Sequence, residues 1–283
     1  MKRFFTLCIA LCTLKMGLAQ TDSTKQDAPD TIHVGGMVIV REKGSKPAEE
    51  SRKNKNPHIP HHVDKRSNIS TNWWIVDLGF SNYNDRTDIH SAGAQAFAPA
   101  YQQNSEWPSL LGGKSRNVNI WIFMQRLNLI QHSLNLKYGA GLELNNYFYD
   151  DVRVRYVENP TTIILDPNLQ FAKKNKLAAD YLTVPVMLNF NFTPNKTNSS
   201  YNSFGFSVGV SAGYLYSARQ KTKLDGNIAK THGNFDLDHW KLAYVGEILL
   251  GPVKFYGSYA FKSMWTKGLD QTPYTFGFRI STW

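Results

Sequence analysis

Apolar and polar residues alternate one by one along much of the chain, and the last ten residues show the pattern most clearly. Tyr274, Phe276, Phe278 and Ile280 are each separated by a single residue. Because successive side chains of a strand point to opposite faces, this spacing places the four residues on one side of a strand. The pattern predicts a strand over about 274–283, although Trp283 lies out of register with the other aromatic residues.

The same period recurs seven more times after residue 72, and turn residues such as Gly, Pro and Asn separate the segments. The predicted strands span about 73–83, 117–130, 133–148, 179–192, 203–217, 237–250, 253–261 and 274–283. Pairing of 152–157 with 163–165 as a membrane hairpin would raise the number of strands to ten. Each of those segments, however, is shorter than the roughly 9 to 11 residues of a spanning strand.

The two faces of the predicted strands differ as those of a membrane barrel do. Over 134–145, Leu, Tyr and Ala at even positions alternate with Asn, Lys, Gly and Glu. One face is suited to lipid and the other to a polar interior. The second strand is apolar on both faces, so the sequence does not decide which of Ile120 and Trp121 meets lipid. We expect an all-β fold, an eight-stranded antiparallel transmembrane β-barrel over 72–283.

Composition supports a barrel over membrane-spanning helices. Mean hydropathy is negative, and no segment after residue 19 contains 18 consecutive apolar residues. Helical spanning needs about 20 such residues, whereas barrel strands expose only alternate positions to lipid. The formal net charge of +10 is spread along the chain and does not indicate a nucleic-acid groove.

The first nineteen residues have the pattern of a secretory signal peptide. Basic residues at 2–3 precede an apolar stretch at 4–14, and small residues at 17–19 suit cleavage after Ala19. The apolar stretch is too short for a helical anchor. Both cysteines lie within it, so we expect no thiol, disulfide or cysteine metal site in the mature chain.

Residues 20–71 are polar and predict a flexible periplasmic segment. Within it, 31–40 is β-prone around a Gly-Gly pair and predicts a short hairpin, a strand added to a partner's sheet, or a weakly ordered linker. We expect any protein partner to bind through 31–71. Three histidines at 58, 61 and 62 lie near Asp64, as in some metal sites, but the intervening prolines favour a solvated linker.

Connection lengths predict the orientation of the barrel. The links after the second and sixth strands are two residues long, at 131–132 and 251–252, whereas those after the odd-numbered strands are longer. Outer-membrane barrels have short periplasmic turns and long external loops. We therefore expect both termini in the periplasm of a Gram-negative bacterium.

Several of these features together resemble one known family. They are the signal end at Ala19-Gln20, the polar N-terminal segment, the strand 181–186 with sequence Tyr-Leu-Thr-Val-Pro-Val, and the aromatic terminal strand. Over 72–283 the chain resembles the PorT-like outer-membrane barrels of Bacteroidetes-type bacteria. The resemblance implies that Pro185 is an expected feature, although proline removes a ladder donor. It implies no shared catalytic residues, and some members are implicated in protein secretion.

The alternation places charged residues of both signs inside the barrel. They are Asp77, Lys137, Glu143, Lys241, Glu247, Lys254 and Arg279. Side chains about fill the interior of an eight-stranded barrel, so we expect these charges to pair into a network that closes the lumen. The alternative is a narrow ion path lined by the same residues.

The longest external links contain two further candidate sites. An external basic rim of Arg153, Arg155, Lys173, Lys174 and Lys176 is suited either to lipopolysaccharide phosphates or an anionic partner, or is solvated loop charge. A second group could form a hydrolase site at the rim, without a Gly-x-Ser-x-Gly elbow: Ser217, His232, Asp236, Asp238 and His239.

These features lead to one main functional hypothesis. We expect a non-enzymatic envelope scaffold or partner-binding component in contact with outer-membrane lipid and lipopolysaccharide, with a possible link to secretion. We expect no catalytic residue, cofactor, metal or nucleic-acid partner. The alternatives are a small passive channel and, less favoured, a lipid hydrolase at the rim.

Overall fold

The computed structural model describes residues 30–34, 37–41, 67–193 and 203–281. The expected signal peptide at 1–19, the histidines at 58, 61 and 62, and Trp283 lie outside them. The chain divides into two compact units, 1–63 and 64–283. In the first unit, β1 (Asp30–Val34) and β2 (Met37–Arg41) pair antiparallel. Of the three alternatives for 31–40, the structure shows the short hairpin.

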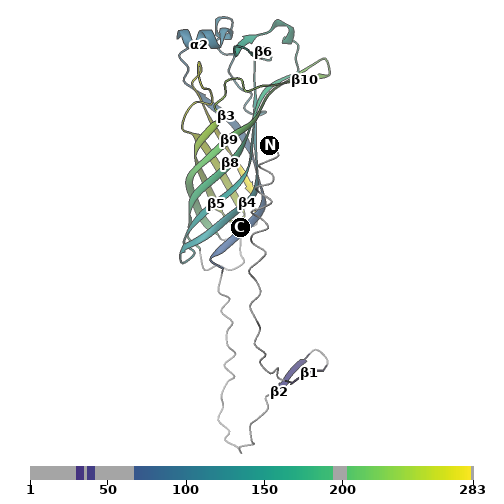
Figure 1. The fold of residues 1–283 in the computed structure, drawn as a ribbon, viewed down its shortest axis with the longest axis vertical. Coiled ribbons are helices and arrows are strands. Elements are labelled where there is room, and N and C mark those ends of the chain that lie inside the picture. Colours follow the sequence, from purple (N-terminus) through teal and green to yellow (C-terminus); the bar gives the residue numbers. More distant parts are fainter. Residues whose placement is uncertain (1–29, 35–36, 42–66, 194–202, 282–283) are drawn as a thin grey trace, which may run out of the picture. The chain divides into compact units, whose positions relative to one another are not determined.

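In the second unit, eight antiparallel strands close into a ring (Figure 1). They are β3 (Ile69–Asp85), β4 (Arg116–Ile130), β5 (Leu134–Phe148), β8 (Lys174–Asn191), β9 (Phe204–Leu224), β11 (Trp240–Leu250), β12 (Val253–Ala260) and β13 (Gln271–Ile280). Each strand pairs with the next, and β13 pairs with β3. Closure leaves no unpaired edge in the ring. The predicted eight-stranded barrel is confirmed.

The ten-stranded alternative is wrong. β6 (Val154–Val157) and β7 (Thr162–Leu165) pair with each other but form a separate two-stranded sheet. With four residues each, they are too short to span a membrane. None of the helices in the described ranges combines the length and apolar character needed to cross a bilayer.

The strands expose the predicted apolar residues on one face and bury the alternate residues on the other. On β8, Leu182, Val184, Val186 and Leu188 are 42–46% exposed, and the residues between them are buried. Pro185 lies in this central strand, between β5 and β9. Between the pairs Tyr138↔Val186 and Gly141↔Thr183, β5 and β8 have no paired residues. Pro185, which has no backbone N–H to donate, therefore lies at a gap in the hydrogen-bond ladder.

A local irregularity in β3 and β4 settles the face of Trp121. Trp74 has a φ of 57°, and the register between β4 and β5 shifts between Trp121 and Phe123. Such bulges place two successive residues on one face. Trp73 and Trp74 are therefore both exposed, while Trp121 is buried inside the barrel at 5% exposure.

Several strands extend beyond their predicted bounds, and β8 and β9 extend farthest at one end. β8 begins at Lys174 and β9 continues to Leu224, where it turns into β10 (Asn227–His232). The turn consists of Asp225 and Gly226, with φ of 47° and 82°. Positive φ at both central residues is typical of a type I′ hairpin, for which Asp-Gly is a favoured sequence. The β9–β10 hairpin projects at the end of the barrel where the long links lie (Figure 1).

The long links pack into an aromatic core at that end. They include α2 (Ala92–Phe97) and the 3₁₀ turns η1 (Pro99–Gln102) and η2 (Pro167–Leu169). The buried aromatic residues of this core include Trp107, Tyr149, Tyr156, Phe235 and Trp265. The rings of Tyr156 and Trp265 stack at 5.9 Å between centroids. Because the cluster continues into the barrel through Tyr181 and Leu215, the aromatic core covers this mouth.

Candidate functional site

The centre of the barrel interior is an ion pair between the first and last strands. Asp77 of β3 and Arg279 of β13 are directly opposite in register. Arg279 donates from Nε to Asp77 Oδ1 at 2.6 Å and from Nη2 to Oδ2 at 2.7 Å. Bidentate geometry of this kind is the strongest form of a charge-assisted hydrogen bond. The pair also joins the two strands whose contact closes the ring.

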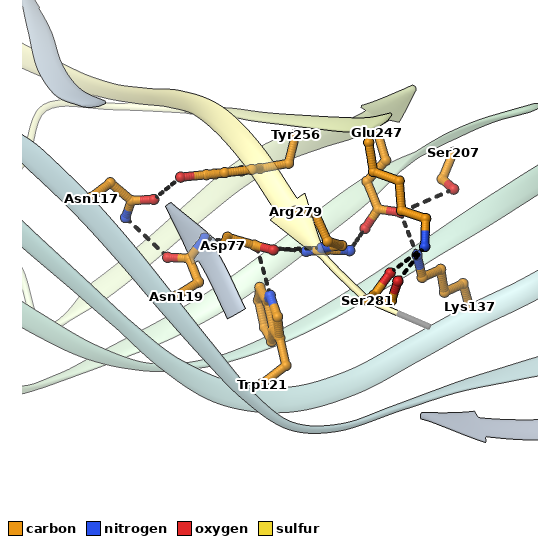
Figure 2. Close-up of polar contacts among 11 residues, drawn as sticks. Asp77, Asn117, Asn119, Trp121, Lys137, Ser207, Glu247, Tyr256, Arg279 and Ser281 are labelled. Carbon is orange, nitrogen blue, oxygen red and sulfur yellow. Dashed lines mark hydrogen bonds and ion pairs between the residues drawn. The ribbon is translucent and has the colours of Figure 1, made fainter. Parts of the chain in front are cut away.

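Polar side chains extend the network toward the loop end (Figure 2). Trp121 Nε1 donates to Asp77 Oδ2 at 2.7 Å, and Asn119 Nδ2 donates to the same oxygen at 3.2 Å. Asn117 Nδ2 donates in turn to Asn119 Oδ1 at 3.0 Å, and the Tyr256 hydroxyl donates to Asn117 Oδ1. Asp77 therefore accepts from four donors, which offsets the cost of burying its charge completely.

Four further interior charges also lie in ion pairs. Glu247 accepts from both Arg279 and Lys137, and Lys241 pairs with Glu143. Asn145 Nδ2 donates to Glu143 Oε1 at 3.0 Å. Three acids thus face three bases, so these six residues are neutral together. We call the six charges and their polar partners the interior network.

Lys254 contacts the end of the terminal strand. Its Nζ donates to the Ser281 backbone oxygen at 2.8 Å and to Ser281 Oγ at 2.7 Å. The structure therefore brings six of the seven predicted lumen residues into ion pairs with one another. It places the seventh against the end of the terminal strand.

Little space remains inside the barrel. A cavity of about 30 Å³ lies among Asp77, Trp121, Glu143, Glu247 and Arg279, which is room for about two water molecules. An apolar layer adjoins it, formed by Ile75, Trp121, Met124 and Met187. The arrangement can hold buried charges in fixed pairs, and the cavity among them is too small to serve as a water-filled channel.

Several members of this interior could not be assigned from the sequence. Both faces of the strand that contains Trp121 are apolar, so the side on which Trp121 lies was undecided. Asn117 and Asn119 belong to an alternating polar series that could have identified them, whereas Asn145 lies on the inward face predicted over 134–145. Tyr256 faces inward from a strand whose other aromatic residues face outward. Its position in the alternation predicts the inward face, but an aromatic residue is not expected among polar interior side chains.

The external basic rim divides into two parts. Arg153 binds Asp151 through two hydrogen bonds, of 3.0 and 2.7 Å, and Arg155 binds Asp166 at 2.6 Å. These two arginines are neutralised locally by acids of the same link. Lys174 and Lys176 instead lie over the Phe148 ring, with Nζ 4.8 and 5.2 Å from its centroid. Lys173 bonds through its backbone N–H to the Lys223 oxygen at 2.8 Å.

The Arg153 contact gives a testable pH dependence. Hydrogen bonds from Arg153 lower the pKa of Asp151 from 3.8 to about 2. Because the folded pKa is depressed, the contact stabilises the link above about pH 4, and this contribution is lost as the pH falls toward 2. In a carboxyl-carbon NMR titration, Arg153→Gln should raise the Asp151 midpoint toward 3.8. Arg155→Gln, which removes the partner of Asp166, should leave it unchanged. An unaltered midpoint in Arg153→Gln would refute the assignment.

The possible hydrolase residues lie close together without forming a triad. Ser217, His232 and His239 line one depression of about 300 Å³. Ser217 Oγ accepts from Arg219 Nη1 at 3.2 Å, and within the described ranges no hydrogen bond joins it to a histidine. Asp236 and Asp238 pair with Lys267 and Lys262. The serine therefore lacks a general base in this geometry. No metal-binding group of three His, Cys, Asp or Glu side chains occurs among the residues described.

Comparison with known proteins adds a family match. A family model described as "Outer membrane protein beta-barrel domain" matches residues 94–266. No curated protein matches the chain. Among solved structures, Neisserial surface protein A is 11% identical, covers 75% of this chain and 99% of its own, and has a TM-score of 0.30. Ail of Yersinia pestis, solved with the heparin analogue sucrose octasulfate, is 10% identical, covers 74% and 98%, and has a TM-score of 0.29.

Proposed function

The chain belongs to the outer membrane protein β-barrel domain family, and from this we propose that it is a non-enzymatic envelope scaffold whose barrel does not conduct ions. The observation that supports this proposal is the filled interior. Six charges are held in mutual ion pairs, and the cavity among them has a volume of about 30 Å³. A conducting pore needs a continuous polar path, whereas a scaffold needs only a stable closed barrel.

The aromatic core adds a second barrier to a channel. Trp107, Tyr149, Phe235 and Trp265 are buried together where the long links meet the barrel. An ion entering from this side would have to cross tightly packed aromatic residues before reaching the polar interior. Burial of these rings also stabilises the links as a folded surface, which is suited to contact with another macromolecule.

The lengths of the links support the proposed placement of the chain in the envelope. In this proposal the short turns at 131–133 and 251–252 face the periplasm and the aromatic core faces outward. A signal peptide at 1–19 directs export, and residues 20–66 lie in the periplasm. We further propose that, within the family, the chain belongs with the PorT-like barrels of Bacteroidetes-type bacteria, some of which are implicated in protein secretion.

A periplasmic partner binds through the N-terminal segment in this proposal. The β1–β2 hairpin supports it, because a two-stranded sheet has free edges to which a partner strand can pair. An isolated hairpin is marginally stable in water. Binding to a partner sheet would satisfy its outer backbone groups and stabilise it.

Crosslinking in living cells followed by mass spectrometry tests the scaffold role. Full-length protein is compared with a deletion of residues 31–66, which ends before β3 begins at Ile69. A second variant, Ile39→Pro, removes one backbone donor from β2 and leaves the segment's length unchanged. We expect a specific envelope protein to crosslink to the full-length chain and to be lost from both variants. The absence of a specific partner for the full-length chain would contradict the proposal.

A further inference from the structure

Lysines lie directly opposite one another where β8, β9 and β10 extend past the lipid-facing residues. Lys176 of β8 is paired in register with Lys221 of β9, and Lys221 with Lys230 of β10. In the adjacent row, Lys174 is paired with Lys223. We call these five residues the lysine ladder. Directly opposed residues have Cβ atoms about 5 Å apart, and like charges at that separation destabilise a sheet.

The lysine ladder lies on the outer wall of the barrel. The register between β5 and β8 is constant from Leu142↔Leu182 to Phe148↔Lys176, so Lys174 and Lys176 share the outward face of Leu182 and Val184. The intervening residue Asn175 points the other way, because its amide donates to the Val152 oxygen at 2.9 Å. Lys221 and Lys223 share the outer face through their pairing.

Acidic residues do not neutralise this surface. In the part of the chain that the structure describes, none of the five lysines forms an ion pair with a carboxylate. The nearest ion pair in register joins Asp180 and Arg219, so the charge of this carboxylate is already balanced by an arginine. Lys176 donates to the uncharged Asn146 side chain. The five lysines therefore have no acidic partner on this side of three adjacent strands, and the arrangement suits an anionic ligand.

The position of the lysine ladder along the barrel axis indicates which anionic ligand it would bind. On β9, Tyr214 and Tyr216 are half exposed on the outer face, as residues of an aromatic belt at the membrane surface are. Lys221 lies five residues farther along the strand. With a rise of about 3.3 Å per residue and a tilt near 40°, it lies about 13 Å beyond Tyr216 along the barrel axis. This backbone position lies outside the lipid, but a lysine side chain can reach back along the wall, so its ammonium group can meet the phosphorylated headgroups of outer-leaflet lipids.

We propose that the lysine ladder binds the phosphates of a glycolipid of the outer leaflet, of the lipid A class. Lysine ammoniums are suited to phosphate oxygens, and charge-assisted hydrogen bonds would replace the repulsion between opposed lysines. The apolar residues below, such as Leu182 and Val184, would contact the acyl chains of the same molecule. Arg153 and Arg155 play no part in this site, because each is paired with an acid.

Lipid retention tests the site. Full-length protein is reconstituted into phosphatidylcholine vesicles containing lipid A with two phosphates, extracted with detergent, and analysed by native mass spectrometry for bound lipid A. Lys221→Gln/Lys223→Gln should lower retention about tenfold, given the strength of charge-assisted hydrogen bonds. Lys221→Arg/Lys223→Arg should retain the lipid. The matched control, Lys262→Gln/Lys267→Gln, removes two cations at the same end that are already paired with Asp238 and Asp236, and should bind like the unaltered protein.

Two further arms identify the source of the phosphate. Vesicles with dephosphorylated lipid A should give retention as low as that of Lys221→Gln/Lys223→Gln, and inorganic pyrophosphate in solution should not displace bound lipid A. Equal retention by the glutamine variant and the unaltered protein would overturn the proposal, as would displacement by pyrophosphate. Heat-modified gel mobility shows whether each variant folds. The site requires the outer-membrane barrel but not a closed lumen, so its failure is distinguishable from failure of the scaffold proposal.

Discussion

Asp77→Ala is expected to destabilise the barrel by about 3 to 5 kcal/mol, the cost of breaking a buried ion pair by removing one partner. The substitution leaves the Arg279 guanidinium inside the barrel without its bidentate acceptor, and it leaves Trp121 Nε1 without a hydrogen-bond acceptor. The contact between β13 and β3 that closes the ring lies at the same place. The free energy of unfolding is measured by urea titration in lipid vesicles, with tryptophan fluorescence as the signal.

Two comparisons separate this effect from a general loss of charge. Asp270→Ala removes an exposed carboxylate at the loop end and should change stability by less than about 0.5 kcal/mol. Asp77→Leu/Arg279→Met removes the pair as a unit and leaves Glu247 with Lys137. Since replacing both partners avoids an uncompensated charge, the double variant should be more stable than Asp77→Ala. An Asp77→Ala protein within about 1 kcal/mol of the unaltered chain would refute the role assigned to this pair.

Gly209→Ala should also prevent normal packing, at a cost of about 3 kcal/mol. A Cβ at this inward position of β9 would lie 2.1 Å from the Val186 backbone oxygen and 2.5 Å from the Met187 Cα. Backbone atoms of a paired strand cannot move aside cheaply, so the clash outweighs the roughly 0.5 to 1 kcal/mol that replacing glycine by alanine in a strand usually gains. Urea titration and heat-modified gel mobility measure the effect.

Gly246→Ala is the matched control. This glycine lies on the outer face of the neighbouring strand β11, and its nearest contact for an added Cβ is the Ser207 oxygen at 3.8 Å. The substitution should leave stability unchanged or raise it by about 0.4 to 1 kcal/mol, through lower entropy of the unfolded chain. Similar effects of the two substitutions would show that the close approach at Gly209 does not limit packing.

The barrel could be predicted from the sequence because its signal is local and repeated. In β13, the exposed faces of Phe276, Phe278 and Ile280 and the buried Arg279 follow directly from the period of two. The ends of the strands were harder to predict from the sequence. β8 begins at Lys174 and β9 ends at Leu224, and both extensions lie beyond the apolar band, where the lipid-facing positions are polar and the amphipathic signal ends.

The candidate site could be predicted only in part, for a related reason. Alternation predicted the inward face of Asp77, Glu143 and Arg279, because that depends on position in one strand. The choice of ion-pair partner depends on register between strands distant in sequence, as in the 202-residue separation of Asp77 and Arg279. The lysine ladder could not be predicted from local alternation either. Lys221 and Lys223 lie opposite Lys176 and Lys174 only because β9 pairs with β8.

Single-channel recording in planar lipid bilayers tests the central claim, that the interior network closes the lumen. The purified full-length protein is recorded beside a channel-forming barrel as a positive control. A cavity of about 30 Å³ among paired charges predicts membrane insertion without reproducible discrete conductance steps. Discrete steps whose cation or anion preference changes in Lys137→Gln or Glu247→Gln would show that ions pass these residues, and would contradict the closed barrel.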